Sequence, residues 1–239
     1  MKNKNKFWDS KVKSGYYDIV LKNGLKKNKG IQSNYHNLTF TKVLQRIVNS
    51  NKNLDYACGP GTFNGLYFKK LSIGYDISRK QINYANKKYS SLNLIFTNNK
   101  SEVNLNAPFE SITVIGLIEF LTDSEIIDEI DYLYELLTTN GKLILTTPNY
   151  NNIFRFIMKI RYIFGNINYE DQTINKFNSK RIKNLMSETK FTQVRVEKIV
   201  NVGFIFSIFS HKIGTFIENV IRKYFLLKSG FILIVELKK

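Results

Sequence analysis

Short apolar runs alternate with amphipathic segments through most of the chain. The runs that end at a polar or turn residue predict buried strands, and they end at Asp55, Asp76, Thr97, Glu119 and Pro148. Segments with a helical spacing or a capping residue predict helices between them, over residues 39–49, 62–70, 78–89 and 123–137. This alternation predicts a parallel sheet with helices on both faces.

The segment LDYACGPG carries the first candidate chemistry. Asp55 ends a buried strand, and the backbone then turns through Gly59 and Gly61. Glycines let a main chain pass close to a ligand where a Cβ would clash. The helix predicted from Thr62 would point its N-terminus at that ligand. Asp76 closes the next strand, where a carboxylate can accept both hydroxyls of a ribose.

These motifs resemble class I S-adenosylmethionine-dependent methyltransferases, in particular the small-molecule group that includes the ubiquinone and menaquinone biosynthesis methyltransferases. The family's first motif reads roughly LDxGCGxG, and Ala57 replaces its first glycine. Phe120 stands where a later motif often has histidine. The competing nicotinamide dinucleotide fold needs a third glycine where this chain has Asn64. The matching positions, within residues 38–149, are Leu54, Asp55, Cys58, Gly59, Gly61, Gly74, Asp76, Ser78, Phe109, Glu110, Glu119, Leu137, Gly141, Leu143, Pro148 and Asn149.

The resemblance implies an α/β fold: a doubly wound, mostly parallel seven-stranded sheet, the Rossmann-like methyltransferase fold, with an antiparallel strand near the edge and a helical lid. It implies that residues 1–37 form a lid or substrate-side segment; the alternative is a terminal helix that simply docks. Residues 38–239 would form the methyltransferase domain, with residues 150–190 as a helical cap insertion. The late elements predicted are helices over residues 150–168 and 179–189 and strands over Phe191–Val200 and Gly230–Lys239.

The resemblance also implies S-adenosylmethionine as the cofactor. We expect Asp55 to hold its amino acid end, Asp76 its ribose and Ile77 its adenine, with Asn98 or Asn99 at the adenine edge. Because free Cys often packs as a small apolar side chain, we do not expect Cys58 to act as a nucleophile. The spacing of Cys and His predicts no metal site. The other cofactor-binding candidates are Ala57, Cys58, Gly59, Gly61 and Glu119.

Few residues qualify as a general base. His36 is the catalytic candidate, with His211, Tyr35 and Tyr150 behind it, although a lone histidine is more often structural. Holding an acceptor in line with the S–C bond can supply about 7–11 kcal/mol. A general base typically adds about 10²–10⁴-fold. A missing base would therefore not oppose methyl transfer.

The net charge of +17 lies on the two flanks of the chain. Residues 1–30 carry +7, residues 31–150 are neutral and residues 151–239 carry +10. This distribution favours an anionic partner: an anionic substrate, an anionic membrane surface or nucleic acid. Compositional drift is the alternative, since the chain is rich in Lys, Asn and Ile.

Two late apolar and basic segments, residues 150–168 and 202–227, either pack in the core or face a membrane. We favour packing, because a domain of this size needs them for its core. The single cysteine excludes an internal disulfide and suits a reducing cytoplasm. The apolar runs fall short of the roughly 18 residues that span a bilayer, and the first residues lack the apolar stretch of a signal peptide. We expect a cytoplasmic protein, with peripheral membrane contact as an alternative.

The sequence thus predicts a methyltransferase that acts on O or N of a small metabolite by in-line displacement, and the charge favours an anionic or lipid-linked one. An RNA methyltransferase is an alternative, although the sequence has no recognisable RNA-binding module or base-reading signature. A non-catalytic scaffold subunit with the same fold is another. Nucleic acid is the less favoured partner, and the oligomeric state is not predicted.

Overall fold

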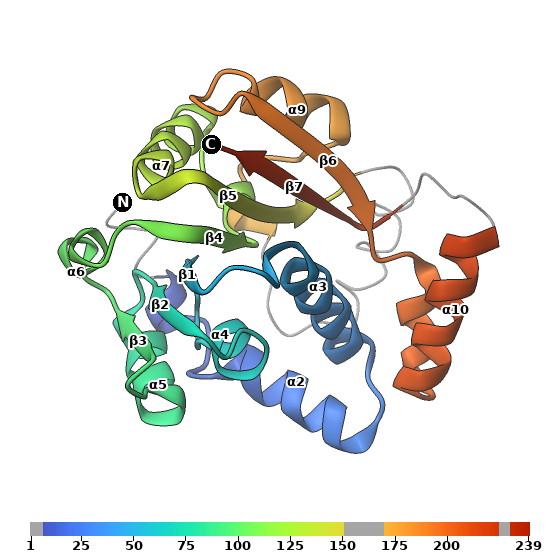
Figure 1. Cartoon of the computed structure of the whole chain (residues 1–239). Helices are drawn as coiled ribbons and strands as arrows, with labels where there is room; N and C mark the ends of the chain where they lie inside the picture. Colours follow the sequence, from blue (N-terminus) through green and yellow to red (C-terminus); the bar gives the residue numbers. More distant parts are fainter. Residues whose placement is uncertain (1–6, 151–169, 225–229) are drawn as a thin grey trace.

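A seven-stranded sheet forms the centre of the protein (Figure 1). The structure is a computed structural model and describes residues 7–150, 170–224 and 230–239. The strands lie in the order β3-β2-β1-β4-β5-β7-β6. Their bounds are β1 Lys52–Tyr56, β2 Leu71–Tyr75, β3 Leu94–Thr97, β4 Phe109–Ile115, β5 Leu137–Pro148, β6 Gln193–Ile199 and β7 Ile232–Lys238.

All strands except β7 share one direction. β1 pairs in parallel with β2 and with β4, β2 pairs with β3, and β4 pairs with β5. β7 lies between β5 and β6 and is antiparallel to both. This arrangement confirms the predicted fold class, including the antiparallel strand near the edge. The carboxyl ends of β1, β2 and β4 consequently meet at one edge of the sheet, where ligands bind in open α/β folds.

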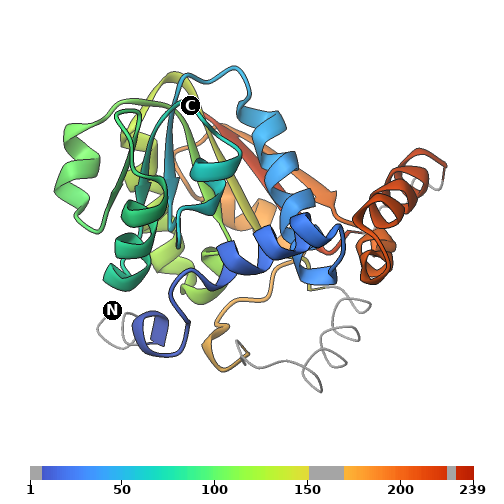
Figure 2. The same ribbon diagram turned by 90° about the horizontal axis from the view of Figure 1, so that it is seen from below.

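Helices cover both faces of this sheet (Figures 1 and 2). They are α2 Tyr16–Lys27, α3 Ile31–Ile47, α4 Thr62–Leu66, α5 Arg79–Tyr89, α6 Lys100–Leu105, α7 Asp123–Glu135, α9 Ser179–Met186 and α10 His211–Tyr224, with 3-10 turns η1 Ile118–Phe120, η2 Glu170–Gln172 and η3 Val202–Ile208. Helices α7 and α9 share a core with one face, to which Leu143 contributes. Helices α3 and α4 share a core with the other face, to which the next residue, Ile144, contributes. Leu143 and Ile144 are adjacent in β5, and their side chains point to opposite faces of the sheet, as in any pleated strand.

The first core helix begins earlier than predicted. Helix α3 starts at Ile31 rather than at Thr39, so it includes His36. Its first half buries Ser33 and Asn34, which are polar, and an apolar periodicity therefore does not reveal it. The bounds of helix α2 were not predicted for the same reason, because Asp18 is among its buried residues.

The predicted helix over residues 150–168 lies outside the described residues, except for Tyr150. The described part of the segment over residues 202–227 packs in the core only in part, because Phe204 is buried whereas Ile213, Phe216 and Tyr224 of α10 are exposed. Residues 225–227 lie outside the described residues. No helix in the described part of the chain is long and apolar enough to cross a membrane.

Candidate functional site

The glycine turn follows β1 at the carboxyl edge of the sheet. Asp55 is buried at the end of β1, and its Oδ1 accepts a hydrogen bond of 2.8 Å from Thr113 Oγ1 on β4. The turn then passes through left-handed backbone at Ala57, Gly59 and Gly61, with φ of 63°, 52° and 71°. Such angles favour glycine, so Ala57 occupies the family's first glycine position at a cost in backbone strain. Thr113 was not predicted as a site residue, and its only signal in the sequence is a hydroxyl in an otherwise apolar run.

The two glycines of the turn have different roles. A Cβ on Gly59 would meet no atom within 4 Å, so the chain leaves space on this side. A Cβ on Gly61 would lie 2.4 Å from the ring of Phe96 and 3.0 Å from Ala85 Cβ. Gly61 is therefore required by packing against β3 and α5. The expected close approach to a ligand fits Gly59 better.

Asp76 at the end of β2 is fixed by backbone donors. Its Oδ2 accepts from the Gly59 N–H at 2.8 Å, and its Oδ1 accepts from the Ser78 N–H at 2.8 Å. A carboxylate has about four lone-pair positions, so both oxygens can still accept hydroxyl donors. The glycine turn and the end of β2 are thus in direct contact. That they bind a cofactor together stays a prediction.

Two acidic residues at the carboxyl edge of the sheet have raised pKa values. Burial, with a smaller contribution from the charge of Asp76, raises the pKa of Asp55 to about 7. Burial raises the pKa of Asp76 to about 6, although its two N–H donors act in the opposite direction. Acids with these pKa values gain most from a ligand that brings a positive charge or hydrogen-bond donors.

Buried polar atoms without a partner lie next to the turn. Thr62 Oγ1 and both side-chain polar atoms of Asn64 have no hydrogen-bond partner among the described residues. Such a group costs about 1–3 kcal/mol when it stays unsatisfied, so water or a ligand is expected to bind there. In the sequence, Asn64 is notable only because it stands where a dinucleotide fold needs a third glycine, and its unpaired buried side chain was not predicted.

Glu119 joins the end of β4 to the segment after residue 170. Its side chain is buried, and Oε2 accepts from Thr147 Oγ1 at 3.2 Å. Its backbone carbonyl accepts from the N–H groups of Ile174 and Asn175 at 2.9 and 3.0 Å. Burial raises the pKa of Glu119 to about 7.

The N-terminal segment spans the site from β2 to β4. Ser78 Oγ, next to Asp76, donates to Asp9 Oδ1 at 2.5 Å. On the other side, the ring of Trp8 makes an edge contact with Phe120, with centroids 5.1 Å apart. The geometry suits the lid predicted for residues 1–37, and docking alone would give the same contacts.

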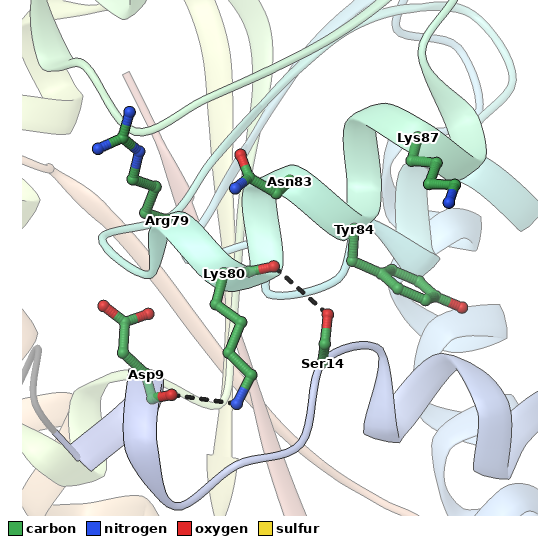
Figure 3. A pocket seen from close by; sticks show the side chains of 7 residues that line it. All are labelled: Asp9, Ser14, Arg79, Lys80, Asn83, Tyr84 and Lys87. Carbon is green, nitrogen blue, oxygen red and sulfur yellow. Dashed lines mark hydrogen bonds between the residues drawn. The ribbon is translucent and has the colours of Figure 1, made fainter.

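A hollow of about 550 Å³ lies between this segment and α5 (Figure 3). Lys80 crosses it and donates to the carbonyl of Asp9 at 3.0 Å, while Ser14 Oγ donates to the carbonyl of Lys80 at 3.5 Å. None of its lining residues is a predicted cofactor residue. No local sequence pattern predicts this hollow, because its walls come from segments that are separated by 68 to 71 residues. The lining residues are Asp9, Ser14, Arg79, Lys80, Asn83, Tyr84 and Lys87.

The remaining cofactor candidates lie at the ends of β2 and β3. Ile77 follows Asp76 in the chain and is 39% exposed, so its side chain is accessible for packing on a ligand ring. Asn99 caps α6, with Oδ1 accepting from the Ser101 N–H at 3.0 Å. Asn98 is exposed and is the better candidate for an adenine edge. Cys58 is buried among apolar side chains, and burial raises its pKa, as expected for a packing residue.

His36 lies in an aromatic cluster on α3. Its ring centroid is 5.5 Å from Tyr17, 5.6 Å from Tyr35 and 6.1 Å from Phe40. Phe40 in turn contacts Phe63 beside the glycine turn, so the cluster reaches the site. His211 is not placed to act as a general base, because it is buried and its Nε2 lies 2.8 Å from Ser33 Oγ. Burial also lowers the pKa of His211. Within the described ranges, no group of three or more Cys, His, Asp or Glu could hold a metal ion.

Comparison with known proteins gives structural matches only. No family model and no curated protein sequence matches the chain. Magnesium protoporphyrin IX methyltransferase from Synechocystis PCC 6803, solved with bound SAH, is 15% identical, with 100% of this chain and 99% of that one covered and a TM-score of 0.64. A SAM-dependent methyltransferase from Archaeoglobus fulgidus is 17% identical, with 85% and 94% covered and a TM-score of 0.57. The plantazolicin methyltransferase BamL, also solved with SAH, is 14% identical, with 99% and 94% covered and a TM-score of 0.60.

These three matches cover 85–100% of this chain. The protein has the fold of the S-adenosylmethionine-dependent methyltransferases.

Proposed function

We propose that the protein is an S-adenosylmethionine-dependent methyltransferase that transfers a methyl group to oxygen or nitrogen of a small metabolite. The observation that carries this proposal is the Asp76 carboxylate, which the Gly59 N–H holds at 2.8 Å beside the space left by the glycine turn. A carboxylate in this position can accept the hydroxyls of a ribose. Similar structures contain SAH, which supports the choice of cofactor.

The other residues of the edge fit the remaining parts of this cofactor. Asp55 would receive the amino acid end, whose ammonium group favours an ionised carboxylate. Ile77 would pack on the adenine, and Asn98 would meet its polar edge. When bound, the cofactor would supply a sulfonium methyl group, which needs no further activation. Trp8 and Phe120, in contact across the site, would exclude water from it.

The acceptor would approach from the side of α3. His36 is the candidate general base on that side, and its aromatic neighbours give the acceptor an apolar wall. Similar structures include a magnesium protoporphyrin IX methyltransferase and a plantazolicin methyltransferase, which supports a small-molecule acceptor. The basic flanks of the chain favour an anionic or lipid-linked one.

Calorimetric titration with S-adenosylmethionine and with S-adenosylhomocysteine tests the proposal. We expect both to bind the wild-type protein and to bind Asp76→Asn at least about tenfold more weakly, since a hydrogen bond to a charged group contributes about 1.5–3 kcal/mol. Asp128→Asn is the matched control, because Asp128 is exposed on α7. Its affinity should equal that of the wild type.

Absence of binding by folded wild-type protein would refute the proposal and favour the non-catalytic scaffold. Equal binding by wild type and Asp76→Asn would refute the assigned ribose site. Where binding is confirmed, the His36→Gln variant should lose turnover and keep cofactor affinity if His36 is the base.

A further inference from the structure

Helix α10 turns much of its apolar face away from the protein, with Ile217, Val220 and Ile221 only half-buried. The side that packs against η3 and α3 carries His211, Gly214 and Glu218, which are the buried residues of this helix. Ile213, Phe216 and Tyr224 are exposed instead. In a globular protein the apolar stripe of a surface helix normally faces the core. The inversion therefore indicates that something else covers the apolar side.

Further exposed apolar side chains lie in the turn before α10. Ile208 and Phe209 are exposed at the end of η3, and Phe209 is 73% exposed. Phe216, two turns further along, is 67% exposed. In Figures 1 and 2 the helix lies at the rim of the molecule, outside the layers that cover the sheet. The apolar patch, defined as Phe206, Ile208, Phe209, Ile213, Phe216 and Tyr224, is accordingly open to a partner.

Basic side chains surround the apolar patch. Lys212, Arg222 and Lys223 are exposed on α10. The connection between α2 and α3 adjoins the start of α10, where the His211 N–H donates to the Asn28 carbonyl at 2.8 Å. This connection adds the exposed Lys27 and Lys29, and no acidic residue occurs from residue 19 to residue 54. In α10 the single acid, Glu218, is buried on the inner side.

The charge around the apolar patch identifies the partner. A second copy of the chain would bring the same basic rim against this one, which opposes self-association. An anionic lipid surface instead attracts each nearby Lys or Arg by about 1 kcal/mol, while aromatic and aliphatic side chains enter the headgroup region. We propose that the apolar patch and its basic rim dock the protein on an anionic membrane surface.

This docking would bring the candidate site close to the membrane. Helix α10 and η3 pack on the N-terminal half of α3, where Asn34 Nδ2 donates to Ser207 Oγ at 2.5 Å. The same half of α3 carries His36, and Phe40 further along contacts Phe63 beside the glycine turn. A membrane-bound acceptor would consequently have a short path to the site.

Vesicle flotation tests the docking, with vesicles of phosphatidylcholine alone and vesicles in which one third of the lipid is phosphatidylglycerol. Wild-type protein should float with the anionic vesicles and stay unbound with the neutral ones. The double variants Phe209→Ser/Phe216→Ser and Lys212→Gln/Lys223→Gln should each bind at least about tenfold more weakly. The matched controls are Leu92→Ser/Leu105→Ser and Lys87→Gln/Lys88→Gln, whose side chains are exposed elsewhere.

Several outcomes would overturn the proposal. If the wild-type protein floats with neither kind of vesicle, the proposal is wrong. An equal loss in the control pairs would show that binding depends on overall charge or apolarity and not on the apolar patch. A dimer in analytical ultracentrifugation that Phe209→Ser/Phe216→Ser dissociates, without vesicle binding, would show that a second copy covers the patch. The assay contains no cofactor and no acceptor, so its result is independent of the proposed methyl transfer.

Discussion

Helices α7 and α10 have nearly the same length, 13 and 14 residues, and both are amphipathic, yet they present opposite faces to the protein. Helix α7 buries Ile126, Ile130 and Leu133 against the sheet. Helix α10 buries a histidine, a glycine and a glutamate and leaves much of its apolar side exposed. Periodicity in a sequence therefore identifies an amphipathic helix, but it does not identify what the apolar face contacts.

The inner side of α10 explains how a helix can dock by its polar face. Gly214 lets α10 approach η3 closely, because a Cβ there would lie 2.0 Å from Ser207 Oγ. The Asn201 N–H donates one hydrogen bond that both carboxylate oxygens of Glu218 share, at 2.7 and 2.9 Å. Close approach and paired polar groups replace the apolar burial that holds α7.

The largest expected effect is the difference in stability between variants of a buried apolar residue on α7 and of an exposed one on α10. Ile130→Ala on α7 should lower the free energy of unfolding by about 2–5 kcal/mol, because it removes buried methyl groups and leaves a cavity. Phe216→Ala on α10 should change it by no more than about 0.5 kcal/mol, because the side chain is already in water. Urea unfolding followed by circular dichroism measures both. A loss above 2 kcal/mol for Phe216→Ala would show that the apolar side of α10 packs within the protein.

The polar inner side of α10 should give an intermediate effect. Glu218→Ala removes the acceptor of the buried Asn201 N–H and should cost about 1–3 kcal/mol in the same unfolding assay. Asn219→Ala, on the neighbouring exposed position, is the control and should be nearly neutral. If both variants have the stability of the wild type, polar contacts do not hold α10.

The sequence was sufficient for the parts of the fold that depend on local patterns. Helix α7 has a regular apolar stripe and a capping box at Thr122, and it was predicted almost to its bounds. The glycine turn and Asp76 were predicted together, because a parallel sheet places successive strand ends at the same edge. That edge is also where the structure brings Gly59 and Asp76 into contact.

The sequence was insufficient where buried polar groups or distant segments determine the structure. Asp18 on α2 is buried and accepts from Tyr84 Oη at 2.7 Å, a contact between residues 66 positions apart. Contacts such as that between Asp9 and Ser78 likewise join the N-terminal segment to α5. The orientation of α10 depends on Gly214 and Glu218 meeting η3, and no local pattern contains that information.

The smallest expected effect concerns the pH dependence of stability. Burial raises the pKa of Glu218, so the folded protein retains this proton at pH values where the unfolded chain has lost it. The stabilisation is complete below the unfolded pKa of about 4.5 and is lost as the pH rises through the folded pKa, with a slope of at most about 1.4 kcal/mol per pH unit for one proton. Asp55, Asp76 and Glu119 act in the same direction up to about pH 7, 6 and 7.

Unfolding free energies measured from pH 4 to neutrality should therefore fall for the wild type, and the fall should be shallower for Glu218→Gln, which cannot ionise. Asp128→Asn is again the control, because Asp128 lies on the outer side of α7 and its variant should keep the wild-type slope. If Glu218→Gln has the same slope as the wild type, the pKa of Glu218 is the same in the folded and unfolded chain, and its inner position does not perturb it. The difference between α7 and α10 would then rest on apolar exposure alone, which the comparison of Ile130→Ala with Phe216→Ala measures separately.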